Sequence, residues 1–375
     1  MENINSVCFV GRVEKILPME ADNLEQVIIS GWECVVQKGS VKENDLVALA
    51  TVDAVIPFKF AEELGITKYL KNRKKYGVYT VKTTKLRGVY SQATIIDDFK
   101  LSNKIPKEGT DLMKAYGITK FEEPEQEVQT PKGKKVRYHK NPNFHVYHKF
   151  PNAKNAPEMF TPEDVVVVTR KIHGTNARYG IVRKEKITLW DRIRKLFNPY
   201  AFYQYVYGSH TVEKGGDNVG FYGTDVWATV ANKYYIKNVL WRWVKKNPPE
   251  SLGEGIIIYG EIFGPNIQKY YTYDENELKL KLFDIKVKGE YVNIADFIAY
   301  CSNELNIPYA PILYFGPFDR EIIEPFLQQY IGRSKVPHEG VVVKHESGSR
   351  EKIAKFISPL YNEFQSKKED STDFH

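Results

Sequence analysis

The chain has 375 residues, 42% of them hydrophobic, and 54 lysines and arginines against 47 acidic residues give it a formal charge of +7. This length and composition exclude a disordered chain and favour two domains. The three cysteines, Cys8, Cys34 and Cys301, are too widely spaced for a disulfide framework or a cysteine-based zinc site, so we expect a reducing compartment. Because no basic leader and no membrane-spanning run occurs, we expect an intracellular protein, cytoplasmic or nuclear, with no membrane partner.

Residues 1–110 are predicted to form an all-β domain. Short apolar segments with alternating character are separated by turn residues, and one short helix is expected at residues 60–64. Five or six such strands in about 90 residues suit a small closed barrel. The predicted strands are residues 6–13, 24–29, 33–36, 45–50, 76–81 and 92–96.

A connector is predicted at residues 111–158, where Pro142, Pro151 and Pro157 interrupt any long helix. A second domain, of the α+β class, is predicted at residues 159–375. Its expected strands are residues 165–168, 256–259, 279–285 and 340–344, and its expected helices are residues 191–197 and 224–246.

The sequence Lys171-Ile-His-Gly-Thr-Asn176 follows the first of those strands. A strand therefore delivers a lysine into a tight glycine turn, which fixes the position of the amine. A lysine becomes a nucleophile when burial or neighbouring cations lower its pKa from about 10.4. Four further segments follow in order, Tyr259-Gly-Glu261, Lys281-Leu-Phe-Asp-Ile285, Glu339-Gly-Val-Val-Val-Lys344 and Ile353-Ala-Lys-Phe356.

These five segments resemble motifs I, III, IIIa, IV and V of the covalent nucleotidyltransferases, the superfamily of DNA ligases, RNA ligases and mRNA capping enzymes. Only twenty residues follow Lys355, too few for the barrel that most DNA ligases and capping enzymes carry there. Residues 86–92 resemble the OB-like amino-terminal module of the Deinococcus and Naegleria type of ATP-dependent RNA ligase. The resemblance to this type covers nearly the whole chain.

The resemblance implies an N-terminal OB-like β-barrel that binds RNA, followed by an α+β adenylyltransferase domain with an ATP-grasp-like ligase fold. It implies ATP and Mg²⁺ or Mn²⁺ as cofactors. The implied reaction joins an RNA 3′-OH to a 5′-phosphate, as at nicks in a duplex, through a lysyl–AMP intermediate and an adenylylated 5′ end. Oligomeric state is left open.

Motif positions imply the roles of individual residues. Lys171 would be the nucleophile, Glu339 would bind the metal, and Glu261 would hold the ribose or a second metal. Lys355 would contact the α-phosphate. Phe283 would stack on adenine, with Val341 or Val343 on the other face. The full set expected to bind ATP or AMP is Arg170, Ile172, Asn176, Glu261, Phe283, Val341, Val343, Lys352 and Lys355.

Three assignments stay open. The second lysine of motif V is replaced by Ile353, so Lys344 or Lys352 would substitute. The arginine of motif Ia has no clear counterpart, and His210 or Arg178 could take its place. His173 would either orient the nucleotide or serve as a structural hydrogen-bonding residue.

Two basic segments are candidates for RNA contact. Residues 187–205 mix aromatic and basic side chains, which can stack bases and follow phosphates. They equally suit an amphipathic helix that packs through Trp190, Ile193 and Phe197, which we favour, with RNA contact left to its basic face. Residues 71–75 form the second basic candidate.

Two rival functions remain. A DNA ligase or capping guanylyltransferase is disfavoured by the missing C-terminal barrel. An RNA-binding protein with an inactive transferase domain is disfavoured because Lys171, Glu261 and Glu339 are all present.

Overall fold

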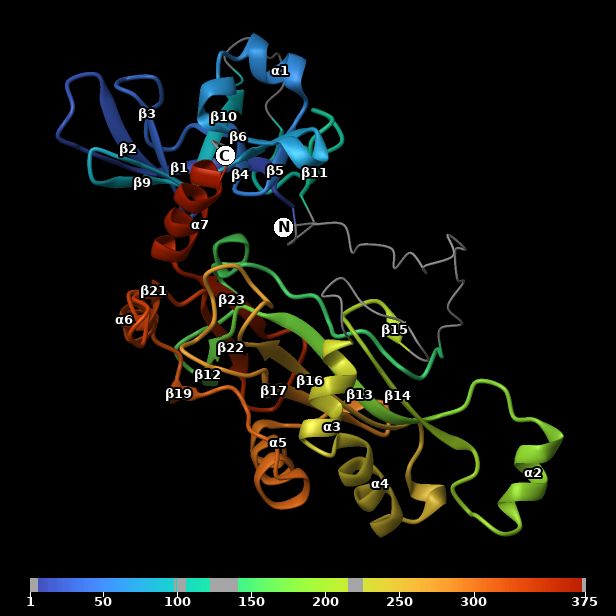
Figure 1. The fold of residues 1–375 in the computed structure, drawn as a ribbon. Helices are drawn as coiled ribbons and strands as arrows, with labels where there is room; N and C mark the ends of the chain where they lie inside the picture. Colours follow the sequence, from blue (N-terminus) through green and yellow to red (C-terminus); the bar gives the residue numbers. More distant parts are fainter. Residues whose placement is uncertain (1–5, 98, 100–105, 122–140, 215–224, 373–375) are drawn as a thin grey trace. The chain divides into compact units, whose positions relative to one another are not determined.

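The computed structural model describes residues 6–97, 99, 106–121, 141–214 and 225–372 (Figure 1). Contacts divide the chain into two compact units. The first comprises Met1–Pro124, Phe150–Thr161 and Ala354–His375, and the second comprises Glu125–Lys149 and Pro162–Ile353. Two segments predicted to lie outside the first domain, residues 150–161 and 354–375, therefore cluster with it. Residues 122–140 of the predicted connector lie outside the described part of the chain.

The first unit is built on an antiparallel sheet with the strand order β10-β4-β1-β2-β3. Successive side chains of a strand point to opposite faces of the sheet, and along β1 the side chains on both faces are buried. Cys8 and Val10 join one hydrophobic cluster, whereas Phe9 and Val13 join another. The strands are β1 (Cys8–Leu17), β2 (Leu24–Ile29), β3 (Trp32–Gln37), β4 (Leu46–Thr51) and β10 (Ala93–Asp97).

A second sheet in this unit has the order β11-β5-β7-β6, and β8 and β9 form a separate pair. All six predicted strand segments fall on β1, β2, β3, β4, β7 and β10, and the predicted short helix is α1. The remaining elements are β5 (Ala54–Ile56), α1 (Phe58–Glu63), β6 (Leu70–Arg73), β7 (Val78–Val81), β8 (Thr84–Leu86), β9 (Val89–Ser91), β11 (Thr119–Lys120) and α7 (Pro359–Thr372).

The second unit contains a six-stranded antiparallel sheet with the order β15-β14-β13-β16-β17-β18. Its strands are β13 (Thr175–Arg183), β14 (Tyr203–Gly208), β15 (Glu213–Lys214), β16 (Gly255–Phe263), β17 (Lys279–Val287) and β18 (Glu290–Tyr291).

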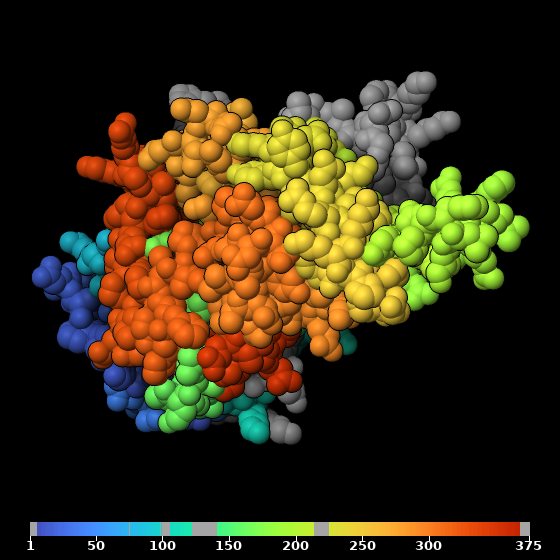
Figure 2. Space-filling view, turned by 90° about the horizontal axis from the view of Figure 1, so that it is seen from below, coloured from blue at the N-terminus to red at the C-terminus, as the bar shows by residue number. Residues whose placement is uncertain are grey.

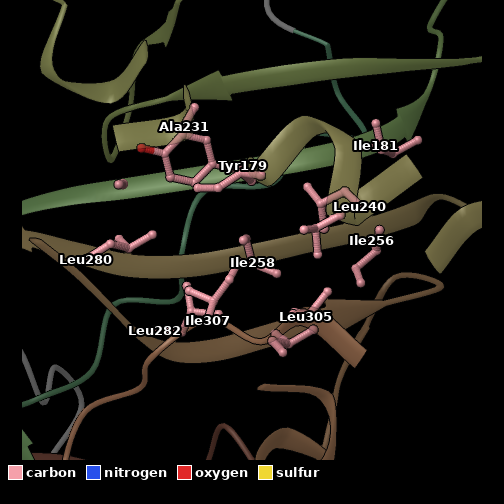
Figure 3. Packing of buried hydrophobic residues seen from close by; sticks show 14 of the residues in the cluster. Tyr179, Ile181, Ala231, Leu240, Ile256, Ile258, Leu280, Leu282, Leu305 and Ile307 are labelled. Carbon is pink, nitrogen blue, oxygen red and sulfur yellow. The ribbon is translucent and has the colours of Figure 1, made fainter. Parts of the chain in front are cut away.

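Helices cover one face of this sheet. Tyr179 of β13, Ile258 of β16 and Leu282 of β17 project to this face and belong with Leu240 to one buried cluster (Figure 3). The opposite face carries the polar Glu261 together with the buried rings of Tyr259 and Phe263. The helices are α3 (Val226–Lys233), α4 (Ile236–Lys246) and α5 (Ile294–Ala299), which continues into a π-helical turn (Tyr300–Leu305).

A second sheet of this unit contains β19 (Ile312–Pro317), β12 (Val165–Lys171) and β22 (Gly340–His345), with β12 in the middle. Helix α6 (Arg320–Leu327) packs on β22. The chain then enters β23 (Ile353–Ile357), where it passes from the second unit to the first. Two short strands, β20 (Tyr330–Ile331) and β21 (Val336–Pro337), pair with each other.

The predicted helix at residues 224–246 is two helices, because Tyr235 between α3 and α4 adopts a left-handed conformation with φ of 52°. The predicted helix at residues 191–197 is α2 (Leu189–Lys195). Its expected packing through Trp190, Ile193 and Phe197 is wrong, since these side chains are 71%, 40% and 86% exposed.

All three cysteines are buried and unpaired. Cys8, Cys34 and Cys301 lie in three separate hydrophobic clusters. Among the described residues, no helix is long and apolar enough to cross a membrane.

Candidate active site

Lys171 ends β12, and its partner in the ladder with β22 is Gly340. Glu339 directly precedes that glycine, so the two strand ends bring the side chains together. Lys171 Nζ lies 2.7 Å from Glu339 Oε1, and His173 Nδ1 lies 3.6 Å from Glu339 Oε2. The Glu339 carboxylate is only 12% exposed, so the lysine is its principal counter-charge.

The turn after Lys171 is close-packed. A Cβ atom on Gly174 would lie 2.2 Å from the carbonyl oxygen of Ile262, so only glycine fits without displacing β16. The main chain is held from the loop after β16, where Gln268 Nε2 donates to the Gly174 carbonyl at 2.8 Å. The backbone N–H of His173 donates to the Tyr273 hydroxyl at 2.6 Å.

A row of polar side chains crosses the sheet beside this turn. Asn176 of β13 pairs with Glu261 of β16, which pairs with Lys281 of β17. Paired residues in antiparallel strands project to the same face, so the three form one row on the face that the helices leave open. Glu261 acts electrostatically on both Lys171 and Glu339, which places this row at the same site.

The charges of the site depend on one another. Burial lowers the pKa of Lys171, but the Glu339 carboxylate, together with Glu261 when it is ionised, outweighs this effect and raises the pKa above the ordinary value. Burial raises the pKa of Glu261 to about 8. Burial also acts to raise the pKa of Glu339, but Lys171 and His173 hold it at about 2. At neutral pH the free protein therefore holds an ammonium–carboxylate pair, with a neutral Glu261 beside it.

Three buried polar atoms of the site accept or donate no hydrogen bond within the described chain. They are Asn176 Oδ1, His338 Nδ1 and Glu339 Oε2. Three of the six such atoms among the described residues lie here, and water or a bound ligand must satisfy them. No group of three or more metal-ligating side chains occurs among the described residues. Two carboxylates fit Mg²⁺ or Mn²⁺ that is otherwise coordinated by phosphate and water.

A buried apolar cluster adjoins the polar row. Ile172, Phe263 and Ala310 form this cluster, and Phe283 and Tyr273 pack against it. Because Ile172 directly follows the lysine in the sequence, the cluster lies beside the nucleophile.

A buried ionic network holds Phe283 in place beside this cluster. Asp284 Oδ2 accepts hydrogen bonds from Tyr147, Lys344 and Arg350 at 2.8, 2.9 and 2.7 Å. Lys344 also donates to the carbonyl of Phe283 at 2.6 Å, and the ring of Tyr147 meets that of Phe283 edge to face at 4.8 Å. Lys344 is therefore a buried support for Phe283.

The RNA ligase family model matches residues 164–357, which is more than half of the chain. The chain belongs to the RNA ligase family. An OB-fold domain model matches residues 6–97, which confirms the predicted N-terminal module. No curated protein matches this RNA ligase in sequence.

Solved structures of the Naegleria gruberi RNA ligase have the same fold. A mutant without ligand has a TM-score of 0.73 at 19% identity, covering 97% of this chain and 99% of the other. The complex with pyrophosphate has a TM-score of 0.72 at 19% identity, with 98% and 99% covered. A mutant with ATP and Mn has a TM-score of 0.71 at 19% identity, with 96% and 98% covered. The predicted fold class is confirmed: an OB-fold module followed by an α+β ligase domain.

The structure brings together Lys171, Ile172, Asn176, Glu261, Phe283 and Glu339 of the expected site. It corrects the two valines. In the ladder, Val341 pairs with Arg170 and Val343 with Val168, so both project to the face opposite Lys171, where they are fully buried. Val342 shares the face of Lys171 and is half-buried.

Arg170 is also turned away from the nucleophile. Its guanidinium donates to the carbonyl of Phe326 at the end of α6 and to the side chain of Gln329. It therefore anchors α6 to β12 and does not face the site around Lys171.

Lys352 is corrected as well. Its amine pairs with Asp164, which precedes β12 at the end opposite Lys171. A seven-residue strand separates the two ends by roughly 20 Å. Lys355 lies in the part of β23 that belongs to the first unit, where its N–H donates to the Pro151 carbonyl at 3.0 Å.

For motif Ia, Arg178 is buried and donates to the carbonyls of Ser209 and Phe144 at 2.7 and 2.6 Å. It therefore binds the connector and the end of β14. His210 lies in the bend that follows β14.

Sequence reasoning missed Gln268, Tyr271 and Tyr273, which lie in the loop between β16 and β17. The ring of Tyr271 meets that of His173 at 4.7 Å, and its hydroxyl donates to the Pro337 carbonyl. The only sequence signal was an aromatic run, residues 270–273, between motifs III and IIIa.

Proposed function

We propose that this RNA ligase uses ATP and seals RNA through a covalent adenylate on Lys171. The neutral amine of Lys171 attacks the α-phosphate, a P–N bond forms, and pyrophosphate leaves. The AMP then passes to an RNA 5′-phosphate and frees the amine. Attack by an RNA 3′-OH on that activated phosphate finally expels AMP and closes the phosphodiester bond.

One observation carries this proposal: the amine of Lys171 is held 2.7 Å from Glu339, beside three buried polar atoms without a hydrogen-bond partner. Solved structures of the similar Naegleria ligase with ATP and Mn, with AMP and Mn, and with pyrophosphate support the choice of nucleotide and metal.

Glu339 and Glu261 are the residues that would hold a divalent cation. Such a cation would neutralise phosphate charge and compete with Lys171 for the Glu339 carboxylate that keeps the amine protonated. Without the cation, the pairing with Glu339 keeps Lys171 protonated and therefore unreactive. Lys171 would lose its proton only when the nucleotide and metal are both present.

The adenine would lie against Ile172 and Phe283, with Val342 on the other side. Asn176 would accept a hydrogen bond from a ribose hydroxyl through its unsatisfied Oδ1.

The proposed RNA substrate has a 3′-OH and a 5′-phosphate, held side by side as at a nick in a duplex. The OB-fold module would bind the RNA near the join. Because ATP and such RNA ends occur inside cells, the proposal places the enzyme in an intracellular compartment.

Incubation with ATP labelled on the α-phosphate and Mg²⁺ or Mn²⁺ tests the proposal. The protein should acquire the label, and Lys171→Arg should not, because a guanidinium stays protonated and cannot attack. The arginine keeps the positive charge beside Glu339, so thermal stability serves as the folding control. Labelling of Lys171→Arg at the wild-type rate would refute the assignment. Labelled GTP in place of ATP separates ligation from capping.

A further inference from the structure

Helix α2 displays an apolar surface that nothing in the described chain covers. Leu189, Trp190, Leu196 and Phe197 are 71–86% exposed, and Ile193 is 40% exposed. They belong to the excursion between β13 and β14, and Figures 1 and 2 show this segment standing away from the rest of its unit. No other element has so many large exposed apolar side chains among the described residues.

The helix is attached by its polar side. Asp191 is buried, forms a capping box with Thr188 and pairs with Lys184. At 3.6 residues per turn, Leu189, Ile193 and Leu196 fall on one face, and Trp190 and Phe197 fall beside them. That face lies opposite Asp191, so the helix is oriented with its apolar side toward solvent.

Cations border the apolar face. Arg192 and Arg194 flank it and form no ion pair among the described residues, whereas Lys195 lies over the ring of Phe202 at 4.9 Å. The one carboxylate of the helix is the buried Asp191. The exposed surface of α2 is therefore aromatic, aliphatic and purely cationic.

We propose that α2 is an RNA-contacting element that binds the substrate away from the join. Exposed aromatic rings stack on bases, and the guanidinium groups of arginines contact phosphates or stack on bases as well. This inference rests on the proposed sealing of RNA. It adds a second contact with the RNA. This contact raises the affinity for longer substrates and takes no part in the chemistry.

The position of α2 favours RNA over the alternatives. Strand β13 starts four residues after Lys171 and runs nine residues to Arg183, and the pairing of Lys184 with Asp191 ties α2 to the end of that strand. That strand spans roughly 26 Å, equivalent to on the order of ten base pairs along a duplex. The positive charge of Arg192 and Arg194 complements the polyanion that this enzyme joins.

Direct binding of nicked RNA duplexes, followed by fluorescence anisotropy without ATP, tests the proposal. Two duplexes differ only in arm length, about six or about twenty base pairs on each side of the nick. The test variants are Trp190→Ser with Phe197→Ser, and Arg192→Ser with Arg194→Ser. The matched control is Tyr235→Ser with Lys245→Ser, which changes an equally exposed aromatic and a cation elsewhere on the same unit.

Both α2 variants should weaken binding of the long duplex about tenfold and leave the short duplex and the control unchanged. The arginine variant should also reduce the slope of log affinity against log salt by roughly two. Adenylylation of Lys171 and sealing of the short duplex should keep the wild-type rate in both variants. A wild-type protein that failed to adenylylate would refute the proposed function and leave the binding result intact.

Wild-type affinity of the variants for the long duplex would overturn the proposal, and so would an equal loss on both duplexes. Two further measurements test the competing occupants, each with unchanged RNA affinity of the variants. Loss of binding to vesicles of phosphatidylserine and phosphatidylcholine would show that α2 binds a membrane. A change from dimer to monomer in sedimentation would show that it binds a second copy of the chain.

Discussion

Lys171 and Glu339 face each other at 2.7 Å because β12 ends opposite the glycine that starts β22. The pairing register of two strands thus sets the distance between a nucleophile and the carboxylate that keeps it protonated. The same carboxylate has its second oxygen unsatisfied. Glu339 therefore restrains Lys171 in the free protein and remains available to a metal.

Replacing Glu339 should abolish adenylylation. We expect Glu339→Gln to lower the rate at least about 100-fold, since the amide keeps the shape of the side chain but not the charge that a divalent cation requires. The measurement is label transfer from ATP across a titration of Mn²⁺. Normal saturation by the metal with a normal rate would contradict the role given to Glu339.

The raised pKa of Glu261 should make stability depend on pH. Its pKa is about 8 in the folded protein against 4.5 for an ordinary glutamate, so the folded state holds the extra proton between these values. Its contribution to stability is present below pH 4.5 and is lost as the pH rises through 8. Glu261→Gln should thus raise the melting temperature by roughly 5 °C at pH 9 and by less at pH 5.

Glu277→Gln is the matched control for that measurement. Its exposed carboxylate pairs with Lys233 and Lys279, and hydrogen bonds from these lysines lower its pKa to about 2. Its contribution is lost only in acid, so its effect should not grow between pH 5 and pH 9. A pH-independent gain from Glu261→Gln would contradict the buried, neutral carboxyl.

Val342 and Val343 provide a test of which face binds adenine. Val342→Ala should raise the KM for ATP several-fold with little loss of stability, because this side chain shares the face of Lys171. Val343→Ala should cost about 2 kcal/mol of unfolding free energy, since it leaves a cavity in the core, and should leave the KM unchanged. Kinetics of adenylylation and urea unfolding of both variants provide the comparison, and the reverse pattern would refute the register.

Lys344 should act as a positioning residue. Lys344→Met removes one of three donors to Asp284 and the donor to the Phe283 carbonyl. We expect a loss of about 3 kcal/mol in stability and a higher KM for ATP with a smaller change in kcat. Tyr147→Phe keeps the ring against Phe283 and should show a milder form of both effects. An unchanged KM for Lys344→Met would show that the ionic network around Asp284 does not position the nucleotide.

The sequence predicted that Lys171, Glu261, Phe283 and Glu339 would come together, because each lies within or beside an apolar strand segment. Their roles stay predictions. Which valine faces the nucleotide depends on the register between β12 and β22, and no local pattern contains that register. The pairing of Lys352 with Asp164 spans 188 residues and was equally inaccessible.

Helix α2 shows a different limit. Its period predicted a helix with one apolar face, and that prediction was correct. The period does not specify the direction in which the face points, because this depends on how Asp191 is buried with Lys184. The loop that carries Tyr271 and Tyr273 has no regular period at all, and its contacts with His173 arise only in the folded chain.

Each of the three buried thiols lies in a different hydrophobic cluster, so a thiol reagent can probe the three clusters separately. Cys8 and Cys34 report on opposite faces of the N-terminal sheet, and Cys301 reports on the core beneath the active site. Burial raises the pKa of each to about 12, so none should react with an alkylating reagent while its cluster is closed. The rate at which each thiol becomes modified would then measure the local opening of its own cluster. ATP should slow the modification of Cys301 more than that of the other two.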